Sequence, residues 1–294
     1  MDARWKFPIQ KGLSTLIATA LLAGCGTDDL TGPGPAQTEF PPIAGTGGGS
    51  PLALRLNGEM LNILPQKAGK NFVFDAYSHP QTREVAWSRF WTRRLDFTGV
   101  AWDNPRTLTM ITPRHAVLAK HYVRKAGDVV RLHDRRGREV QRVLQGLVGL
   151  DGPWDVAVGI LNEPVPSGVS HYKLLEPSET LHEELLGTLA LVTDNERRVH
   201  VHECGQMSAN TVAFRFPRSL PKGFFEPLIT GDSGNPSFLL VRGEMVLLET
   251  HHRGGAGVGP FYGSAQIQEG IRTAIAQLAV EFGGGEFSFE TIRP

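Results

Sequence analysis

The sequence predicts an all-β fold, because β-prone runs recur along most of the chain, turn residues separate them, and helical periodicity is confined to the end. Of the 294 residues, 34 are glycine and 20 are proline, a composition that favours many turns over long helices. At 40 % hydrophobic residues the chain can bury a sizeable core, which excludes disorder as its dominant state. Many short strands with few helices indicate a sandwich or barrels.

The expected strands are short and begin beyond residue 83. They are 95–102, 108–112, 128–132, 141–150, 155–161, 186–193, 198–203, 212–216, 236–241 and 245–250. The glycine-containing segments 135–138 and 242–244 are expected to be hairpin turns.

One helix is expected near the C-terminus. Its apolar residues are spaced by four, four and three positions and therefore share one helical face. They are Ile267, Ile271, Ile275 and Leu278. The glycines at 283–285 should end this helix.

The first 25 residues have the pattern of an export signal with a lipid-attachment site. A positive start precedes an apolar stretch, 13–23, that is too short to span a bilayer as a stable helix. It ends in Leu22-Ala23-Gly24-Cys25, which resembles the bacterial lipobox and implies that Cys25 is acylated and becomes the new N-terminus. The expected location is the cell envelope, periplasmic or at the surface, with a lipid anchor in the membrane. The alternative is an ordinary secretory signal with a chance cysteine.

The chain is expected to divide into four segments that differ in composition. Residues 1–24 form the expected signal peptide, and residues 25–51, rich in Gly, Pro, Thr and Ser, are expected to form a flexible tether. Residues 52–84 are expected to be an N-terminal extension packed on a barrel, and 85–294 the main domain.

Charge and cysteine content exclude further classes of protein. The chain has 30 basic and 30 acidic residues and no long basic run, so nucleic acid is not an expected partner. Loss of residues 1–24 leaves 27 basic and 29 acidic residues, a faintly acidic body. With Cys25 lipidated, Cys204 is the only remaining cysteine, so the apolar core has to stabilise the mature chain without a disulfide.

The most specific chemical motif is Gly231-Asp232-Ser233-Gly234. Glycine on both sides of a serine allows a tight turn that presents the hydroxyl and aims the N–H groups of Gly231 and Ser233 at one point. A developing oxyanion would lie there, so these two N–H groups are the expected oxyanion hole. The alternative for this segment on its own is a β-turn with a polar tip.

Two other segments precede this loop, Ala119-Lys120-His121-Tyr122 after an apolar run and Trp154-Asp155-Val156-Ala157 at the start of an expected strand. In the order His, Asp, Ser, the three segments resemble those of the trypsin/chymotrypsin-like serine peptidases, and the likeness runs from about residue 83 to residue 282. The resemblance implies a double six-stranded-type β-barrel with a C-terminal helix.

By position, the resemblance implies that Ser233 is the nucleophile, His121 the general base and Asp155 the residue that orients the imidazole. The implied activity is that of a serine endopeptidase, which hydrolyses protein or peptide substrates through an acyl-enzyme and needs no cofactor. His115 is expected to be non-catalytic. The alternative is a cell-envelope binding protein that keeps the fold without turnover.

Three residues near these motifs depart from the family pattern, and a fourth, Asp232, matches the pattern but is expected to have a different partner. Tyr122 stands where a cysteine usually follows the histidine, so packing is expected to hold this loop. Lys120 is expected to point to solvent, and Asn235 to add a side chain near the leaving-group side. Asp232, which in animal digestive relatives pairs with an α-amino group freed by cleavage, has no such junction before residue 90, so activity is expected without that ion pair.

The resemblance also implies a specificity pocket. Its residues are Pro227, Leu228, Thr250, His251 and His252. Pro227 would lie at its base, and since no acidic residue stands there, a preference for Lys or Arg substrates is disfavoured. Thr250 would hydrogen-bond Asp155. His251 and His252 are expected either to admit an acidic side chain or to form an exposed polar loop.

A rival site is His200-Val201-His202-Glu203-Cys204, since alternation along a strand puts two imidazoles and a thiol on one face. These are zinc ligands, yet no C-x-x-C or H-E-x-x-H partner occurs elsewhere, so no metal is expected. We expect an outward polar face beside a free, buried thiol.

Overall fold

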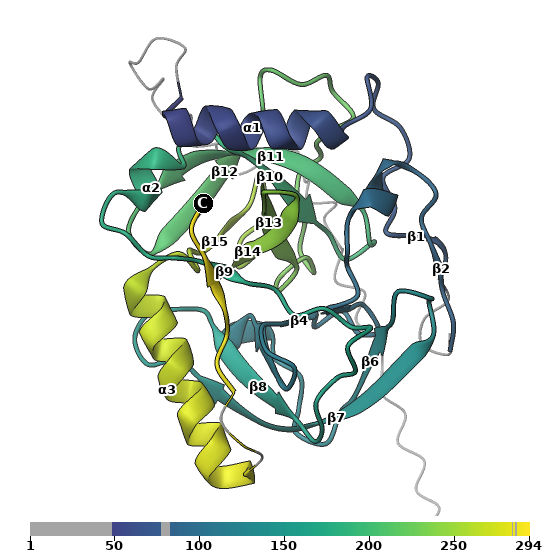
Figure 1. The fold of residues 1–294 in the computed structure, drawn as a ribbon, viewed down its shortest axis with the longest axis vertical. Coiled ribbons are helices and arrows are strands. Elements are labelled where there is room, and N and C mark those ends of the chain that lie inside the picture. The colour runs from purple at the N-terminus through teal and green to yellow at the C-terminus, as the bar shows by residue number, and fades with distance from the viewer. Residues whose placement is uncertain (1–48, 78–82, 284, 286) are drawn as a thin grey trace, which may run out of the picture. The chain divides into compact units, whose positions relative to one another are not determined.

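Two curled β-sheets form most of the structure, a computed structural model that describes residues 49–77, 83–283, 285 and 287–294 (Figure 1). The expected signal peptide 1–24, the lipidation site Cys25 and the tether up to residue 48 lie outside the described residues. The predicted fold class is confirmed, because a nearly closed six-stranded barrel, a curled eight-stranded half-barrel and a C-terminal helix are consistent with a double β-barrel.

The six-stranded sheet has the spatial order β3-β4-β5-β8-β7-β6. Its strands are β3 (Val100–Ala101), β4 (Leu108–Met110), β5 (His115–Leu118), β6 (Val129–His133), β7 (Glu139–Gly149) and β8 (Ala157–Leu161). The predicted hairpin turn at 135–138 joins β6 to β7. Gly137 adopts a φ of 78°, and a Cβ there would lie 2.0 Å from the Val85 carbonyl oxygen, so this turn requires glycine.

The eight-stranded sheet has the order β15-β12-β11-β10-β13-β14-β9-β16. Its strands are β9 (Leu174–Leu175), β10 (Leu189–Thr193), β11 (Val199–Met207), β12 (Thr211–Arg215), β13 (Pro236–Val241), β14 (Glu244–Thr250), β15 (Val258–Pro260) and β16 (Thr291–Ile292). The predicted turn between β13 and β14 is confirmed. It places Arg242 and Gly243 at φ of 54° and 79°, as a two-residue hairpin with positive φ at both central positions does.

The C-terminal helix α3 (Ala265–Phe282) packs against β7 and β8 of the six-stranded sheet (Figure 1). All four residues of the predicted apolar face are buried, which confirms that face. The Ser264 hydroxyl caps the N-terminus by accepting a hydrogen bond from the Ile267 N–H, and Gly283 ends the helix with a φ of 62°.

The residues expected to form an extension include a helix that the sequence analysis did not predict, α1 (Pro51–Ile63). Ser50 caps it, because its hydroxyl accepts a hydrogen bond from the Ala53 N–H at 2.9 Å, and Pro51 suits the first helical position. Ala53, Leu56 and Met60 form its buried face, and the helix packs against β10 and β13. The extension continues into β1 (Phe74–Ala76), which pairs with β2 (Ala86–Trp87).

The expected strand 95–102 is largely wrong. A short 3-10 helix, η1 (Trp91–Arg94), and a loop precede β3. The Asp96 carboxylate accepts hydrogen bonds from the Thr98 N–H at 3.1 Å and the Thr98 hydroxyl at 2.6 Å. Such local bonds of an aspartate side chain compete with the hydrogen bonds of a strand, which explains the turn.

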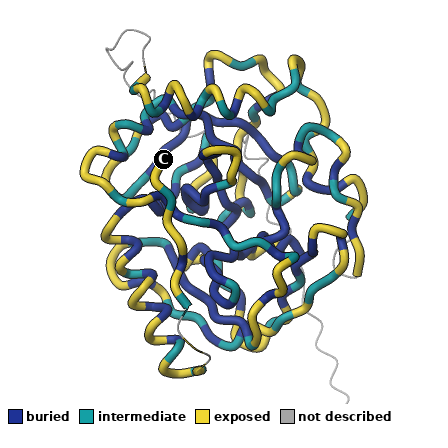
Figure 2. The backbone as a smooth tube through the Cα atoms, in the orientation of Figure 1, coloured by how far each residue is buried: buried dark blue, intermediate teal, exposed yellow. Residues whose placement is uncertain are grey.

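An apolar core connects the two sheets and α3. One cluster of buried side chains contains residues from all three, among them Val117, Val158, Leu191, Phe238 and Ile271. Figure 2 shows the buried backbone concentrated along the central strands. Cys204 is a free, buried thiol, so no disulfide joins the residues that the structure describes. The stability of this part of the chain therefore depends on packing and hydrogen bonds.

The buried His115 on β5 makes stability depend on pH. Burial, together with the charge of Arg114, lowers the pKa of His115 from 6.5 to about 4. The unfolded chain therefore binds a proton on this residue at a higher pH than the folded chain does. The free energy of unfolding consequently falls as the pH drops from about 6.5 to about 4.

We expect His115→Asn to remove this contribution, which is at most about 1.4 kcal/mol per pH unit over that interval. Urea unfolding of the wild type and the variant at neutral pH and near pH 4 measures the difference. The variant should lose less stability on acidification than the wild type. Equal losses in the two proteins would contradict the assigned pKa.

Candidate active site

His121, Asp155 and Ser233 come from different sheets and meet in one hydrogen-bonded chain. His121 Nδ1 lies 2.6 Å from Asp155 Oδ2, and His121 Nε2 lies 3.0 Å from Ser233 Oγ. His121 lies in the short 3-10 helix η2 (Lys120–Tyr122) that follows β5, and Asp155 lies just before β8, both in the six-stranded sheet's connections. Ser233 precedes β13 of the eight-stranded sheet. The structure therefore brings together the three residues that the sequence singled out.

The pairing of β5 with β8 explains why His121 and Asp155 are neighbours. Leu118 at the end of β5 pairs with Ala157 at the start of β8, so the chain leaves one strand where it enters the other. Asp155 Oδ1 also accepts a hydrogen bond from the His121 N–H at 2.8 Å. Since both carboxylate oxygens are engaged, the carboxylate fixes the ring and favours the proton on Nδ1, which leaves Nε2 to accept from Ser233.

The His121 side chain is 48 % exposed, and the Asp155 side chain is 19 % exposed. A substrate can therefore reach the imidazole and the serine, while the carboxylate behind them is partly shielded from water. This order of exposure suits a proton transfer that begins at the serine hydroxyl.

A buried ion pair supports the loop that carries His121. Arg124 Nη2 lies 2.7 Å from Asp103 Oδ1, and the Arg124 guanidinium also donates to the carbonyl oxygens of Arg106 at 2.7 Å and Ala101 at 3.2 Å. The Arg124 side chain is fully buried. The expectation that packing alone holds this loop is therefore incomplete. Lys120 is exposed as a residue, but its side chain does not simply point to solvent as expected, because its ammonium group donates to the Leu150 carbonyl oxygen at 2.7 Å.

Arg124→Met is expected to destabilise the protein by roughly 3 to 5 kcal/mol, because it leaves the Asp103 carboxylate buried without its closest cation. The matched control is Arg55→Met, which breaks the half-exposed pair with Glu59 on α1. That change should cost less than about 1 kcal/mol. Chemical denaturation measures both values, and similar small effects in the two variants would show that the buried pair contributes little.

The serine loop depends on two glycines in the left-handed region. Gly231 and Gly234 have φ values of 106° and 86°. A Cβ on Gly234 would lie 3.3 Å from the Thr107 carbonyl oxygen, so the loop packs tightly against the six-stranded sheet. The N–H groups of Gly231 and Ser233 have no acceptor among the described residues. Both donors are thus available for the oxyanion that the sequence analysis expected there.

The side chain of Asn235 joins the two sheets instead of lying near the leaving group. It is fully buried, its Oδ1 accepts from the Thr107 hydroxyl at 3.0 Å, and its Nδ2 donates to the Asp232 carbonyl oxygen at 3.1 Å. Thr107 directly precedes β4. The expectation for Asn235 is therefore wrong, because an amide can satisfy a donor and an acceptor inside the fold at this position.

The expected pocket residues do not share one environment. Pro227 is exposed rather than at a buried base. Leu228 is buried, and its main chain exchanges hydrogen bonds of 2.7 and 2.9 Å with Gly255. Thr250 Oγ1 lies 2.8 Å from the Tyr262 hydroxyl, in place of the expected bond to Asp155.

His251 is buried, so the expectation of an exposed loop is wrong for this residue. Its Nδ1 lies 2.7 Å from Glu249 Oε1, and its Nε2 lies 3.2 Å from the Thr193 carbonyl oxygen. Its main chain reaches the site, because its carbonyl accepts from the Gly234 N–H at 2.8 Å and its N–H donates to the Asn235 carbonyl at 3.0 Å. His251 therefore supports the two residues that follow Ser233.

His252 is half-buried, and burial lowers the pKa of its imidazole. Its main-chain N–H donates to the Val258 carbonyl oxygen at 2.9 Å. The charges of Asp155 and His121 both act on it, so it lies near the hydrogen-bonded chain. Of the two histidines, only His252 has the exposure needed to meet a substrate.

The rival metal-binding face is buried. His200 Nε2 lies 3.0 Å from Asp194 Oδ2, and the ring nitrogens of His202 lie 2.6 and 3.0 Å from the carbonyl oxygens of Ala256 and Glu226. The prediction of an outward polar face is wrong, whereas the free, buried thiol of Cys204 is confirmed. Among the described residues, no group of three or more His, Cys, Asp or Glu side chains could hold a metal ion.

Arg124, Thr107 and the role of Asn195 were not predicted from the sequence. The partners of Arg124 and Thr107 are 21 and 128 residues away, so no local pattern marks them. Asn195 donates its main-chain N–H to Asp232 Oδ1 at 2.9 Å, a role that any residue except proline could fill. None of the three has a signal in the sequence.

No protein-family model matches the chain, and no curated protein matches it. Within the ranges that the structure describes, no helix combines the length and the apolar character needed to cross a membrane. Function therefore has to be inferred from the fold and from the hydrogen-bonded chain of Asp155, His121 and Ser233.

Proposed function

We propose that the protein is a serine endopeptidase of the trypsin/chymotrypsin-like kind. The observation that carries the proposal is the unbroken chain from Asp155 through His121 to Ser233, with distances of 2.6 and 3.0 Å. The double β-barrel and the order of the three residues along the sequence support it further. Fold alone would not be sufficient, because one fold can host many functions.

The geometry suits acyl transfer. Ser233 Oγ attacks the carbonyl carbon of the scissile peptide while His121 Nε2 takes the hydroxyl proton, and Asp155 stabilises the imidazolium that forms. The carbonyl oxygen becomes an oxyanion that accepts hydrogen bonds from the Gly231 and Ser233 N–H groups. The C–N bond then breaks, and the leaving amine receives the proton from His121. Water, activated by the same imidazole, hydrolyses the acyl-enzyme to free Ser233.

The proposed substrates are proteins or peptides without a requirement for Lys or Arg before the cleaved bond. The segment 227–229 has no acidic side chain. Of the carboxylates near this segment, Glu226 already has a partner, because it lies 2.7 Å from Arg198. A substrate cation beside 227–229 would therefore find no acidic side chain within that segment.

A fluorophosphonate probe tests the proposal, because such probes react with a serine only where a base activates it. We expect stoichiometric labelling of the wild type and no labelling of Ser233→Ala, measured by intact mass. The matched control is Ser237→Ala, four residues further on and fully buried, which should keep full labelling. A folded wild type that resists the probe would instead favour the second candidate, a protease-like binding protein of the cell envelope.

We also propose that the protein is exported and anchored to a membrane through an acylated Cys25, on the strength of the signal pattern and the Leu22-Ala23-Gly24-Cys25 segment. Expression in bacteria with radiolabelled palmitate tests this. The wild type should incorporate label and sediment with membranes. Cys25→Ala should incorporate none and appear in the soluble fraction, and label retained by this variant would refute lipidation at Cys25.

A further inference from the structure

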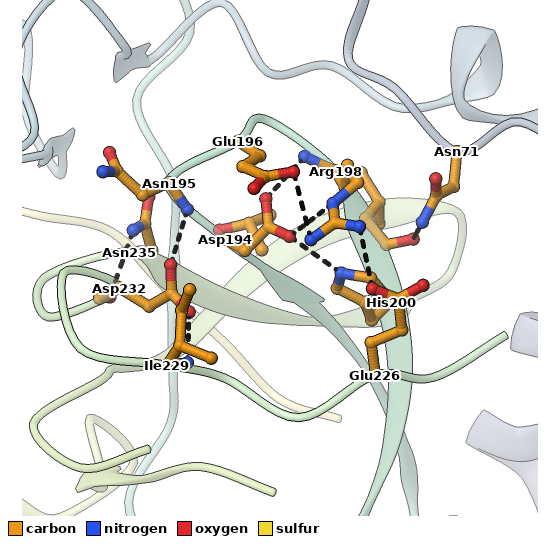
Figure 3. Close-up of polar contacts among 12 residues, drawn as sticks. Asn71, Asp194, Asn195, Glu196, Arg198, His200, Glu226, Ile229, Asp232 and Asn235 are labelled. Atoms are coloured by element: carbon orange, nitrogen blue, oxygen red, sulfur yellow. Dashed lines mark hydrogen bonds and ion pairs between the residues drawn. The ribbon is translucent and has the colours of Figure 1, made fainter. Parts of the chain in front are cut away.

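Asp232 is a buried carboxylate beside the proposed nucleophile, and both of its oxygens are bound by main-chain donors. Oδ2 accepts from the Ile229 N–H at 2.7 Å, and Oδ1 accepts from the Asn195 N–H at 2.9 Å (Figure 3). Asp232 is 4 % exposed, so it has to be hydrogen-bonded inside the fold. Ile229 belongs to the same loop, whereas Asn195 lies in the turn between β10 and β11. The conformation of the serine loop therefore depends on that turn.

The Asp194 carboxylate shapes this turn. It accepts hydrogen bonds from the Arg198 N–H at 2.9 Å, from Arg198 Nε at 2.8 Å and from His200 Nε2 at 3.0 Å (Figure 3). Burial alone would raise the pKa of Asp194, but the hydrogen bonds from His200 and Arg198 lower it. Arg197 in the turn adopts a φ of 63°, which is unfavourable for a non-glycine residue and has to be held by its surroundings.

The N-terminal extension supports this turn through main-chain hydrogen bonds. The Val73 N–H donates to the Arg197 carbonyl oxygen at 2.9 Å, and the Val199 N–H donates to the Asn71 carbonyl oxygen at 2.9 Å. Phe72 and Arg198 form an antiparallel bridge between these bonds. Residues 71–73 thus pair with the hairpin through an isolated β-bridge at the start of β11.

Two side chains of the extension strengthen the contact. Asn71 Nδ2 donates to the Val199 carbonyl oxygen at 2.9 Å. Figure 3 shows Asn71 beside the turn. The Tyr77 ring lies under the Arg197 guanidinium, 4.5 Å from the ring centre. The contact of the extension with the hairpin therefore includes the strained residue itself.

A side chain of the hairpin also lies close to Gly231, whose N–H belongs to the proposed oxyanion hole. Asn195 Nδ2 lies 3.9 Å from the point where a Cβ on Gly231 would stand. A shift of the turn would consequently move both the donor to Asp232 and the wall beside Gly231. The N–H groups of Gly231 and Ser233 flank Asp232, so their direction depends on the same bond.

We propose that the N-terminal extension is a built-in activating segment, and that Asn71 is a positioning residue for the oxyanion hole. The proposal rests on the peptidase function proposed above. Asn71 and Val73 hold the 194–198 turn in the conformation that offers the Asn195 N–H to Asp232, and this bond fixes Gly231 and Ser233 in their active arrangement. The chain supplies the second donor to Asp232 from within, so no newly cleaved N-terminus is required.

Asn71→Ala and Val73→Pro test the proposal, with Asn57→Ala as the matched control. Asn57 is also an asparagine of the extension, and its side chain bonds the Gly187 carbonyl at 2.9 Å and the Leu189 N–H at 2.7 Å, at the other end of β10. Each variant is made in the full chain and assayed for peptide hydrolysis and for affinity toward a peptide boronate, which mimics the tetrahedral intermediate.

We expect Asn71→Ala and Val73→Pro to lower kcat at least about fivefold and to weaken boronate binding in proportion, with KM within about twofold of the wild type, since only transition-state stabilisation is lost. Asn57→Ala should leave kcat unchanged even where it lowers the unfolding midpoint as much. Unchanged kcat in all three variants would overturn the proposal. A kcat that falls in all three in step with stability would also overturn it, because the extension would then be only structural.

Amide hydrogen exchange provides a readout that does not require activity. Asn71→Ala should speed exchange in 229–234 and at Asn195 relative to the wild type, and Asn57→Ala should not. If Asn71→Ala leaves exchange in 229–234 unchanged, the serine loop does not depend on Asn71 and the proposal is overturned. If the wild type shows neither hydrolysis nor labelling by the probe, the proposed peptidase function is wrong. That result differs from a failure of the role proposed for the extension, in which the wild type is active.

Discussion

The candidate site is divided between two sheets, so its geometry depends on the contacts that hold these sheets together. His121 and Asp155 move with the six-stranded sheet, whereas Ser233 moves with the eight-stranded sheet. The bond between Thr107 and Asn235 crosses the boundary two residues after Ser233, and Gly234 packs against the same strand entry. The shared apolar core stabilises the contact between the two sheets but does not fix the alignment of the site, because hydrophobic burial is not directional. Hydrogen bonds therefore fix the alignment that a reaction distance of 3.0 Å requires.

Several buried or partly buried carboxylates among the described residues are satisfied partly by main-chain N–H groups. Asp155 binds the N–H of His121, Asp232 binds those of Ile229 and Asn195, and Asp194 binds that of Arg198. Main-chain donors cost little conformational entropy to hold, because the fold already orders them. In each case a carboxylate fixes a turn that the sequence alone would leave free. A protein without disulfides in its described part thus controls its loops through these polar bonds.

Features of the fold and the site could be predicted where they depend on the order of motifs along the chain or on a local residue pattern. The three residues of the hydrogen-bonded chain could be found because their segments, in order, resemble those of a known peptidase family. The strand at Pro236–Val241 and the apolar face of α3 could be found because residue type and spacing mark them. Helix α1 was missed although Ser50 and Pro51 are helix-start residues, because they adjoin a Gly-rich stretch that predicts a tether. The partner of Thr250 and the exposure of Pro227 depend on how distant segments pack, and a main-chain donor such as Asn195 leaves no trace in the sequence.

The single thiol of the described chain has a consequence for the conditions under which the protein can fold. Cys204 is buried among apolar side chains, and burial raises the pKa of this thiol far above its usual range, so the reactive thiolate is scarce. The only other cysteine of the sequence, Cys25, lies outside the described residues. The domain has no disulfide to form, lose or exchange. Its folding is therefore indifferent to the redox potential of its surroundings, and a reducing buffer and an oxidising compartment should yield the same molecule.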